Sequence, residues 1–142
     1  MTSLTFDTDT LGYMRVLEDT TGVRPVDCLV AEGKIVFLVP SKDLRRAIGA
    51  KGERAQQLKS AMKREIQVIA FSEDAEELIL NIFFPYSPVG VTLTAHPGGG
   101  RHATVQVSEG WKARAIGKEG KQLKIARAVL VRHSDVVSVS VA

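Results

Sequence analysis

The sequence predicts an α+β fold in which one structural unit occurs twice in tandem. The motif Gly-x-x-Gly occurs at residues 49–52 and again at residues 117–120, and Ala-Ile precedes it both times. Around each motif, the hydrophobic residues follow the same order of strand-like and helix-like patterns. Basic residues are concentrated near both motifs. A repeat at a fixed spacing indicates that one supersecondary unit has been duplicated.

The first unit is expected to begin with a helix and a β-hairpin. Residues 4–6 have the composition of a short strand, and residues 7–9 offer caps for a helix. The apolar face of this helix is expected to consist of Leu11, Met14 and Leu17. Two β-rich runs, residues 26–31 and 34–39, are separated by a Glu-Gly dipeptide, which is typical of a hairpin turn.

Two helices on either side of the first glycine motif and a third strand complete the first unit. Ser41 is a plausible N-cap for a helix over residues 42–48. After the motif, helical periodicity extends to about residue 64, and its apolar positions are Ala55, Leu58 and Met62. Residues 66–71 are rich in β-branched residues and are expected to complete a small sheet.

The second unit is expected to repeat this order. Ser72 is expected to cap a helix over residues 73–84, whose first turn is acidic and which Pro85 stops. The hairpin strands, the two helices and the last strand are expected at residues 89–95, 103–107, 111–116, 120–132 and 135–141. The predicted domains are therefore residues 1–72 and 73–142, and the helix over residues 73–84 connects them.

The spacing of the glycines has a physical reason. A tight turn between two helices needs residues that tolerate positive φ, and a ligand approaches the main chain most closely where there is no Cβ. The helix that follows the turn begins with N–H groups that have no partner inside the helix, and with a partial positive charge. Each turn therefore predicts a binding site for an anion such as a phosphate.

Lysine and arginine are concentrated at the two turns, although the net charge of the chain is only +3. Residues 41–65 contain 8 Lys and Arg against 3 Asp and Glu, and residues 109–133 contain 7 against 2. The remainder of the chain carries 4 basic and 11 acidic residues, so it repels nucleic acid from the other faces. A basic surface that coincides with two anion-binding turns favours a nucleic acid as the ligand.

Other classes of function lack the residues that they need. The second motif resembles the end of a P-loop, but it lacks the earlier glycine and the Ser or Thr that would bind magnesium. No arrangement of nucleophile and base stands out, and His96 and His102 alone make a poor metal site. We therefore predict that the protein is not an enzyme and that it binds no cofactor or metal.

The absence of membrane-spanning and signal sequences, and the low cysteine content, bear on the cellular location. No apolar run is long enough to cross a membrane, and the N-terminus has no signal-peptide pattern. Cys28 is the only cysteine, so we expect it to be a small core residue in a protein of a reducing compartment. A cytoplasmic monomer without membrane contact is the expectation.

The order helix, strand, strand, helix, Gly-x-x-Gly, helix, strand resembles that of KH domains of the prokaryotic type (type II). Residues 115–126, Ala-Ile-Gly-Lys-Glu-Gly-Lys-Gln-Leu-Lys-Ile-Ala, are similar to the second KH domain of the NusA family of transcription termination and antitermination factors. The resemblance covers essentially the whole chain, which looks like the short archaeal form that consists of tandem KH domains.

The resemblance implies a protein that binds single-stranded RNA and acts in transcription termination or elongation. In KH domains the glycine turn clamps the backbone of about four nucleotides, and the bases lie in an apolar groove. With the neighbouring basic residues, the implied RNA-binding residues are Arg45, Arg46, Ile48, Gly49, Ala50, Lys51, Gly52 and Arg54, then Arg114, Ile116, Gly117, Lys118, Glu119, Gly120, Lys121 and Lys124. Ile48 and Ile116 would lie at the floor of the groove, and a plain core position is an equally good interpretation of both.

The sequence departs from the family pattern in three respects. Ala50 stands where KH domains often have a basic or polar residue, and Glu119 stands where this family often has asparagine. Glu119 weakens the local attraction for phosphate. Bacterial members contact RNA polymerase through domains for which this chain has no room, so the polymerase is a partner by resemblance alone.

Two alternatives stay open. In the first, the protein is an adaptor that docks on a ribosomal or RNA polymerase subunit, and acidic residues 73–77 form the protein-binding face. The second concerns Trp111, six residues before the second turn. It either stacks on a base or packs at the start of an amphipathic helix.

Overall fold

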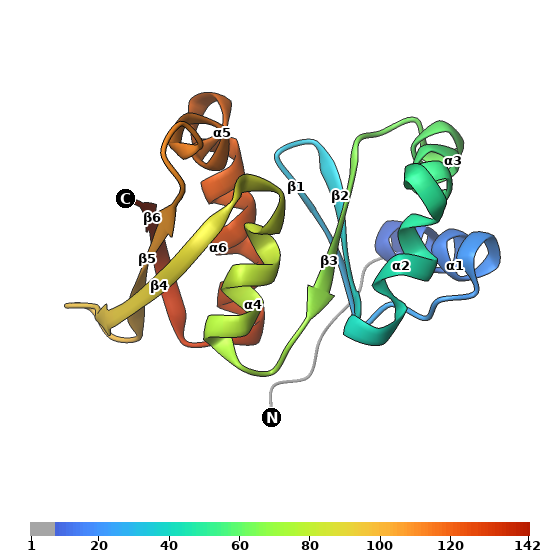
Figure 1. The fold of residues 1–142 in the computed structure, drawn as a ribbon. Helices are drawn as coiled ribbons and strands as arrows, with labels where there is room; N and C mark the ends of the chain where they lie inside the picture. The colour runs from blue at the N-terminus through green and yellow to red at the C-terminus, as the bar shows by residue number, and fades with distance from the viewer. Residues whose placement is uncertain (1–7) are drawn as a thin grey trace. The chain divides into compact units, whose positions relative to one another are not determined.

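The computed structural model describes residues 8–142, which form two compact units. The first unit ends at Phe71, and the second extends from Ser72 to Ala142. Each unit contains helices and one three-stranded sheet (Figure 1). The strand expected at residues 4–6, and Asp7 as a helix cap, lie outside the described residues.

The first unit has one helix before its β-hairpin and two helices after it. Its elements are α1 (Thr8–Thr21), β1 (Asp27–Ala31), β2 (Lys34–Pro40), α2 (Leu44–Ile48), α3 (Glu53–Met62) and β3 (Ile66–Phe71). The central strand β2 is antiparallel to β1 and parallel to β3. Glu32 and Gly33 both have positive φ, as a two-residue hairpin turn requires.

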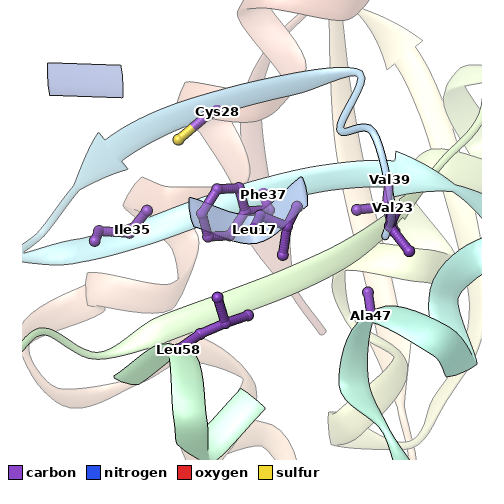
Figure 2. Close-up of a cluster of buried hydrophobic side chains, with 8 residues drawn as sticks. All are labelled: Leu17, Val23, Cys28, Ile35, Phe37, Val39, Ala47 and Leu58. Atoms are coloured by element: carbon purple, nitrogen blue, oxygen red, sulfur yellow. The ribbon is translucent and has the colours of Figure 1, made fainter. Parts of the chain in front are cut away.

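The core of the first unit lies between its sheet and its helices (Figure 2). Residues 35–39 of β2 are all fully buried, and Ile35, Phe37 and Val39 lie on one face of the sheet because successive strand residues point to opposite faces. They pack with Leu17, Val23, Cys28, Ala47 and Leu58 from the neighbouring elements. Cys28 is 2% exposed, which confirms the prediction of a core residue.

The second unit repeats this topology. Its elements are α4 (Ala75–Ile82), β4 (Pro88–Ala95), β5 (Arg101–Val107), α5 (Lys112–Ile116), α6 (Lys121–His133) and β6 (Val136–Val141). The central strand β5 is antiparallel to β4 and parallel to β6. Ala115 is fully buried, as is Ala47 at the equivalent place in the first unit. The predicted α+β fold, with a three-stranded sheet and helices in each unit, is confirmed.

Both predicted serine caps are wrong in detail. Ser41 lies in a 3-10 turn (Ser41–Asp43), and its hydroxyl donates to the carbonyl oxygen of Phe71 at 3.2 Å instead of capping α2. At α4, the carboxylate of Asp74 accepts from the backbone N–H of Glu77 at 3.0 Å. The hydroxyl of Ser72 accepts from the N–H of Asp74 at 3.1 Å, so it supports the cap from two residues earlier.

The helix that opens the second unit is therefore shorter than residues 73–84. It begins at Ala75, because Asp74 adopts extended dihedrals and provides the cap. It ends at Ile82, and the residues around Pro85 form a separate 3-10 turn (Phe84–Tyr86). The same region contains Phe84, a large apolar side chain that is 77% exposed.

Two further expectations need correction. Leu11, predicted to lie on the apolar face of the first helix, is 53% exposed, whereas Thr21 is buried and its hydroxyl donates to the carbonyl oxygen of Leu17 at 2.7 Å. Strand β5 begins at Arg101 rather than at residue 103, since the N–H of Arg101 donates to the carbonyl oxygen of Asp135 at 2.9 Å. Among the described residues, no helix has the length and hydrophobicity needed to span a bilayer.

Candidate nucleic-acid interface

The two glycine turns have nearly the same backbone conformation. The first glycines, Gly49 and Gly117, have φ/ψ of 79°/172° and 80°/164°. The second glycines, Gly52 and Gly120, have 74°/17° and 72°/17°. The repeat that the sequence shows is therefore also a repeat of main-chain geometry.

The first glycine of each turn is required by packing as well as by conformation. A Cβ added to Gly49 would lie 3.0 Å from the backbone nitrogen of Arg54, and one added to Gly117 would lie 2.8 Å from that of Gln122. Their φ/ψ values lie in a region that is essentially restricted to glycine. The turn therefore brings the main chain against the first turn of the next helix.

The second glycine of each turn is required by conformation alone. A Cβ on Gly52 or Gly120 would meet nothing within 4 Å, although both residues have positive φ. The residue before each of them, Lys51 or Glu119, also has positive φ, of 54° and 58°. The open space around the second glycine leaves the main chain accessible to a ligand.

The helices that follow the turns begin without a side-chain cap. Gly52 is the N-cap residue of α3 and Gly120 that of α6, and neither position supplies a side-chain hydrogen bond. The positive ends of both helix dipoles therefore lie at the exposed turns. A helix start of this kind favours an anion, because N–H groups and dipole point toward it together.

Two of the predicted RNA contacts in the first unit have internal partners. A guanidinium nitrogen of Arg54 donates to the carbonyl oxygen of Arg46 at 2.7 Å. A guanidinium nitrogen of Arg46 donates in turn to the carbonyl oxygen of Gly22, which follows α1, also at 2.7 Å. This pair of bonds links α3 to α2 and α2 to the end of α1, so both arginines brace the turn.

The second unit fixes its turn with different side chains. Gln122 stands where the first unit has Arg54; it is 3% exposed and accepts a 3.5 Å hydrogen bond from the hydroxyl of Tyr86. Burial raises the pKa of the Tyr86 phenol. The guanidinium of Arg114 lies 4.9 Å from the ring centroid of Trp111, a cation–π distance. The sequence analysis missed Tyr86 and Gln122, which carry no motif.

The remaining predicted residues lie around the turns as follows. Arg45, Ala50, Lys51, Arg114, Lys118, Glu119, Lys121 and Lys124 are exposed, and Ile48 and Ile116 are half-buried. Ile48 and Ile116 directly follow the buried Ala47 and Ala115, and each side chain is partly exposed to solvent. Each turn thus joins an exposed basic rim to a partly exposed apolar side chain.

The histidines near the second hairpin have local partners. The ring nitrogens Nδ1 and Nε2 of His102 lie 2.6 and 2.9 Å from the hydroxyls of Ser138 and Ser140 on β6. His96 accepts through Nδ1 from the backbone N–H of Gly98 at 3.2 Å. Within residues 8–142, no three His, Cys, Asp or Glu side chains come together as a metal site would require.

Two α+β units, each with a glycine turn between two helices beside a three-stranded sheet, define a protein that is consistent with two tandem KH-like domains. No family model matches the sequence. The chain is NusA-like: it is similar along almost all of its length to short archaeal proteins of that name.

The similarities extend over whole proteins. The chain is 26% identical over 139 residues to the "probable transcription termination protein NusA" of Halococcus morrhuae, covering 98% of this chain and 99% of that protein. It is 27% identical over 141 residues to the protein of the same name from Thermoplasma acidophilum, covering 99% and 97%. A solved structure titled "Crystal structure of APE1850" is 32% identical and has a TM-score of 0.80, covering 96% of this chain and 100% of that one.

Proposed function

We propose that the protein binds single-stranded RNA and acts in transcription termination or elongation. Each unit is then a KH domain of the prokaryotic type, and its glycine turn holds the RNA backbone. The names of the archaeal relatives support the role in transcription, and the repeated turn geometry supports RNA as the ligand.

The observation that carries this proposal is the conformation of the turns. Both turns combine an accessible second glycine with an uncapped helix start, and both repeat to within about ten degrees in φ and ψ. A phosphate is the ligand that uses these features together, because it is an anion that can accept from main-chain N–H groups.

The side chains around the turns divide into two roles. Lys51 and Arg45 in the first unit, and Lys118 and Lys121 in the second, are exposed cations that attract phosphates. Arg46 and Arg54 act mainly by bracing the first turn. Glu119 opposes phosphate binding at the second turn, and the exposed Glu53 does so beside the first.

The single-stranded form of RNA follows from the apolar part of the interface. Ile48 and Ile116 are half-buried beside the turns and would contact bases. Bases can reach such side chains when they are unstacked and unpaired, whereas a duplex presents its phosphates and sugars. The protein would then distinguish single-stranded from duplex RNA more strongly than it distinguishes one base from another.

Aspartate substitutions in the turns test this function. The double variants Ala50→Asp/Lys51→Asp and Lys118→Asp/Glu119→Asp reverse the charge of one exposed lysine in each turn and leave both variable positions acidic. Aspartate tolerates the positive φ of residues 51 and 119, so both variants should fold. We expect each to weaken RNA binding and the combination to abolish it.

The matched control is Arg15→Asp, a charge reversal on the exposed side of α1, which should leave RNA affinity unchanged. Unchanged affinity in the combined turn variant, with an unaltered melting temperature, would exclude the turns as the RNA site. Retained capture of RNA polymerase or ribosomal subunits by that variant would favour the adaptor alternative.

A further inference from the structure

A second basic feature lies at the opposite end of α3 from the first glycine turn. A shallow pocket of about 590 Å³ opens there. It is lined by Gln56, Lys59, Ser60, Lys63, Arg64 and Glu65. Three of these residues are cations and one is an acid, so the pocket carries a net positive charge. None of these residues belongs to the turn or its immediate neighbours.

The single acid in the pocket is already paired. The ammonium nitrogen of Lys59 lies 2.7 Å from a carboxylate oxygen of Glu65. This pairing lowers the pKa of Glu65, so the carboxylate stays charged and its partner is Lys59. Lys63 and Arg64 form no ion pair or side-chain hydrogen bond within the described residues. Two uncompensated cations therefore face the pocket.

Positive charge is not a general property of shallow pockets in this unit. A pocket of about 540 Å³ beside α1 has two cations, Arg15 and Arg24, and two acids, Glu18 and Asp19. Arg24 lies 3.7 Å from Glu18. The remaining lining of this second pocket includes apolar side chains such as Leu11 and Met14. The two pockets are similar in size and differ in charge.

We propose that the pocket at the end of α3 binds phosphates of the same RNA strand after it leaves the first glycine turn. The proposal rests on the RNA-binding function proposed above. Helix α3 has 10 residues, so its two ends are about 15 Å apart, which a few nucleotides can span. Lys63 and Arg64 attract the phosphate, and the Ser60 hydroxyl and Gln56 amide offer hydrogen bonds to its oxygens.

The second unit does not have the same pocket chemistry. Val131 stands where the first unit has Lys63, and its side chain is 46% exposed. Arg127 stands where the first unit has Lys59, and it donates to the carbonyl oxygen of Val137 at 2.9 Å. Arg132 stands where the first unit has Arg64, and Lys124 stands where it has Gln56, so the second unit keeps cations here but lacks the adjacent pair of Lys63 and Arg64.

The conformation of Lys63 provides a clean variant. Lys63 ends α3 with φ/ψ of 55°/36°, in the left-handed region that glycine adopts most easily. Lys63→Gly removes the charge and relieves this conformation, so it should not destabilise the helix end. Lys63→Gly/Arg64→Ala is the test variant. Arg15→Ala/Arg24→Ala, which removes two cations from the pocket beside α1, is the control.

The experiment compares a short and a long single-stranded RNA across a range of salt concentrations. The short RNA has about four nucleotides, the length that one turn clamps. The long RNA has about 12, within the range of about 4–16 that single-strand-binding folds cover. We expect Lys63→Gly/Arg64→Ala to reduce the slope of log K against log salt by about 1.4 for the long RNA, because each lost phosphate contact contributes about 0.7. Its affinity for the short RNA should not change.

The outcomes separate this proposal from the function on which it rests. If Lys63→Gly/Arg64→Ala leaves the slope for the long RNA unchanged while the turn substitutions still abolish binding, the pocket does not bind RNA. The turns would then remain the RNA site. An equal loss in Arg15→Ala/Arg24→Ala would also overturn it, because the effect would then reflect overall charge. If the turn substitutions had no effect on either RNA, the proposed function would fail first.

Discussion

Arg54, in the first turn of α3, donates a 2.7 Å hydrogen bond to the carbonyl oxygen of Arg46 in α2, across the first glycine turn. This bond connects the helices on either side of the turn. A second bond, from the guanidinium of Arg46 to the carbonyl oxygen of Gly22 at 2.7 Å, connects α2 to the residue that follows α1. A basic residue beside the glycine turn can therefore shape the turn without contacting a ligand. This distinction leads to the first prediction.

Arg54→Ala should lower the free energy of unfolding by about 1 kcal/mol, the net contribution of one hydrogen bond. The variant should also weaken RNA binding, because the turn loses its brace. Arg45→Ala is the control: Arg45 is exposed and has no side-chain partner within residues 8–142, so its stability should change by less than about 0.5 kcal/mol. Urea unfolding measures both. Equal stability of the two variants would contradict the bracing role.

The two glycines of each turn should differ in their response to alanine. Gly49→Ala should destabilise by about 3 kcal/mol or more, because it combines a conformation restricted to glycine with contact to the backbone of Arg54. Gly52→Ala should cost about 1 kcal/mol, from its left-handed conformation alone. Denaturant unfolding with an unchanged m-value measures both losses of stability. A larger loss for Gly52→Ala than for Gly49→Ala would show that the backbone around residue 49 shifts to make room for the added Cβ.

Glu119→Lys should strengthen RNA binding by the second turn. The position is exposed and has the same backbone conformation as Lys51 in the first turn, so the new lysine meets no steric obstacle. In the Ala50→Asp/Lys51→Asp background, where the first turn is disabled, we expect about tenfold tighter binding at low salt. The gain should shrink as salt rises. A gain that is independent of salt would indicate a contact other than phosphate attraction.

The pairing of Arg101 with Asp135 predicts a pH-dependent contribution to stability. The Nε of Arg101 lies 2.8 and 3.0 Å from the two carboxylate oxygens of Asp135, and this pairing lowers the pKa of Asp135 below its usual value of 3.8. Because the folded pKa is the lower one, the stabilisation is present above pH 3.8 and is lost as the pH falls through the folded pKa. Asp135→Asn should therefore be less stable than the unchanged protein at pH 7, and the difference in stability should shrink as the pH falls below 3.8. A constant difference across this range would rule out the pairing as its source.

The order of elements and the two turns could be predicted because they depend on local signals. Strand and helix periodicity and glycines that take positive φ are all visible over a few residues, and within residues 8–142 the structure has the predicted elements in the predicted order. The role of Ser41 could not be predicted, since it bonds to Phe71, which is 30 residues away, whereas the Asp74 cap of α4 is a local contact that the prediction missed. The brace of Arg46 on Gly22, and the contact of Tyr86 with Gln122, likewise depend on segments that approach one another only after folding.

The pocket at the end of α3 also could not be predicted from the sequence. Lys63 and Arg64 are visible in the sequence as charges at a helix end, but the pairing of Lys59 with Glu65 decides which charges remain available. That pairing and the shape of the pocket are properties of the fold. The sequence predicted the basic surface as a whole, and the structure separates cations that have internal hydrogen bonds, such as Arg46 and Arg54, from exposed cations such as Arg45 and Lys63.

Titration of the protein with a single-stranded RNA and with a duplex of the same sequence, across a range of salt concentrations, tests the central claim most directly. If one turn contacts about four phosphates, log K for a short single strand should fall against log salt with a slope of about −3, and the duplex should bind more weakly. No binding of the single strand at low salt, or equal binding of the duplex, would contradict the account and make the basic surfaces docking sites for protein.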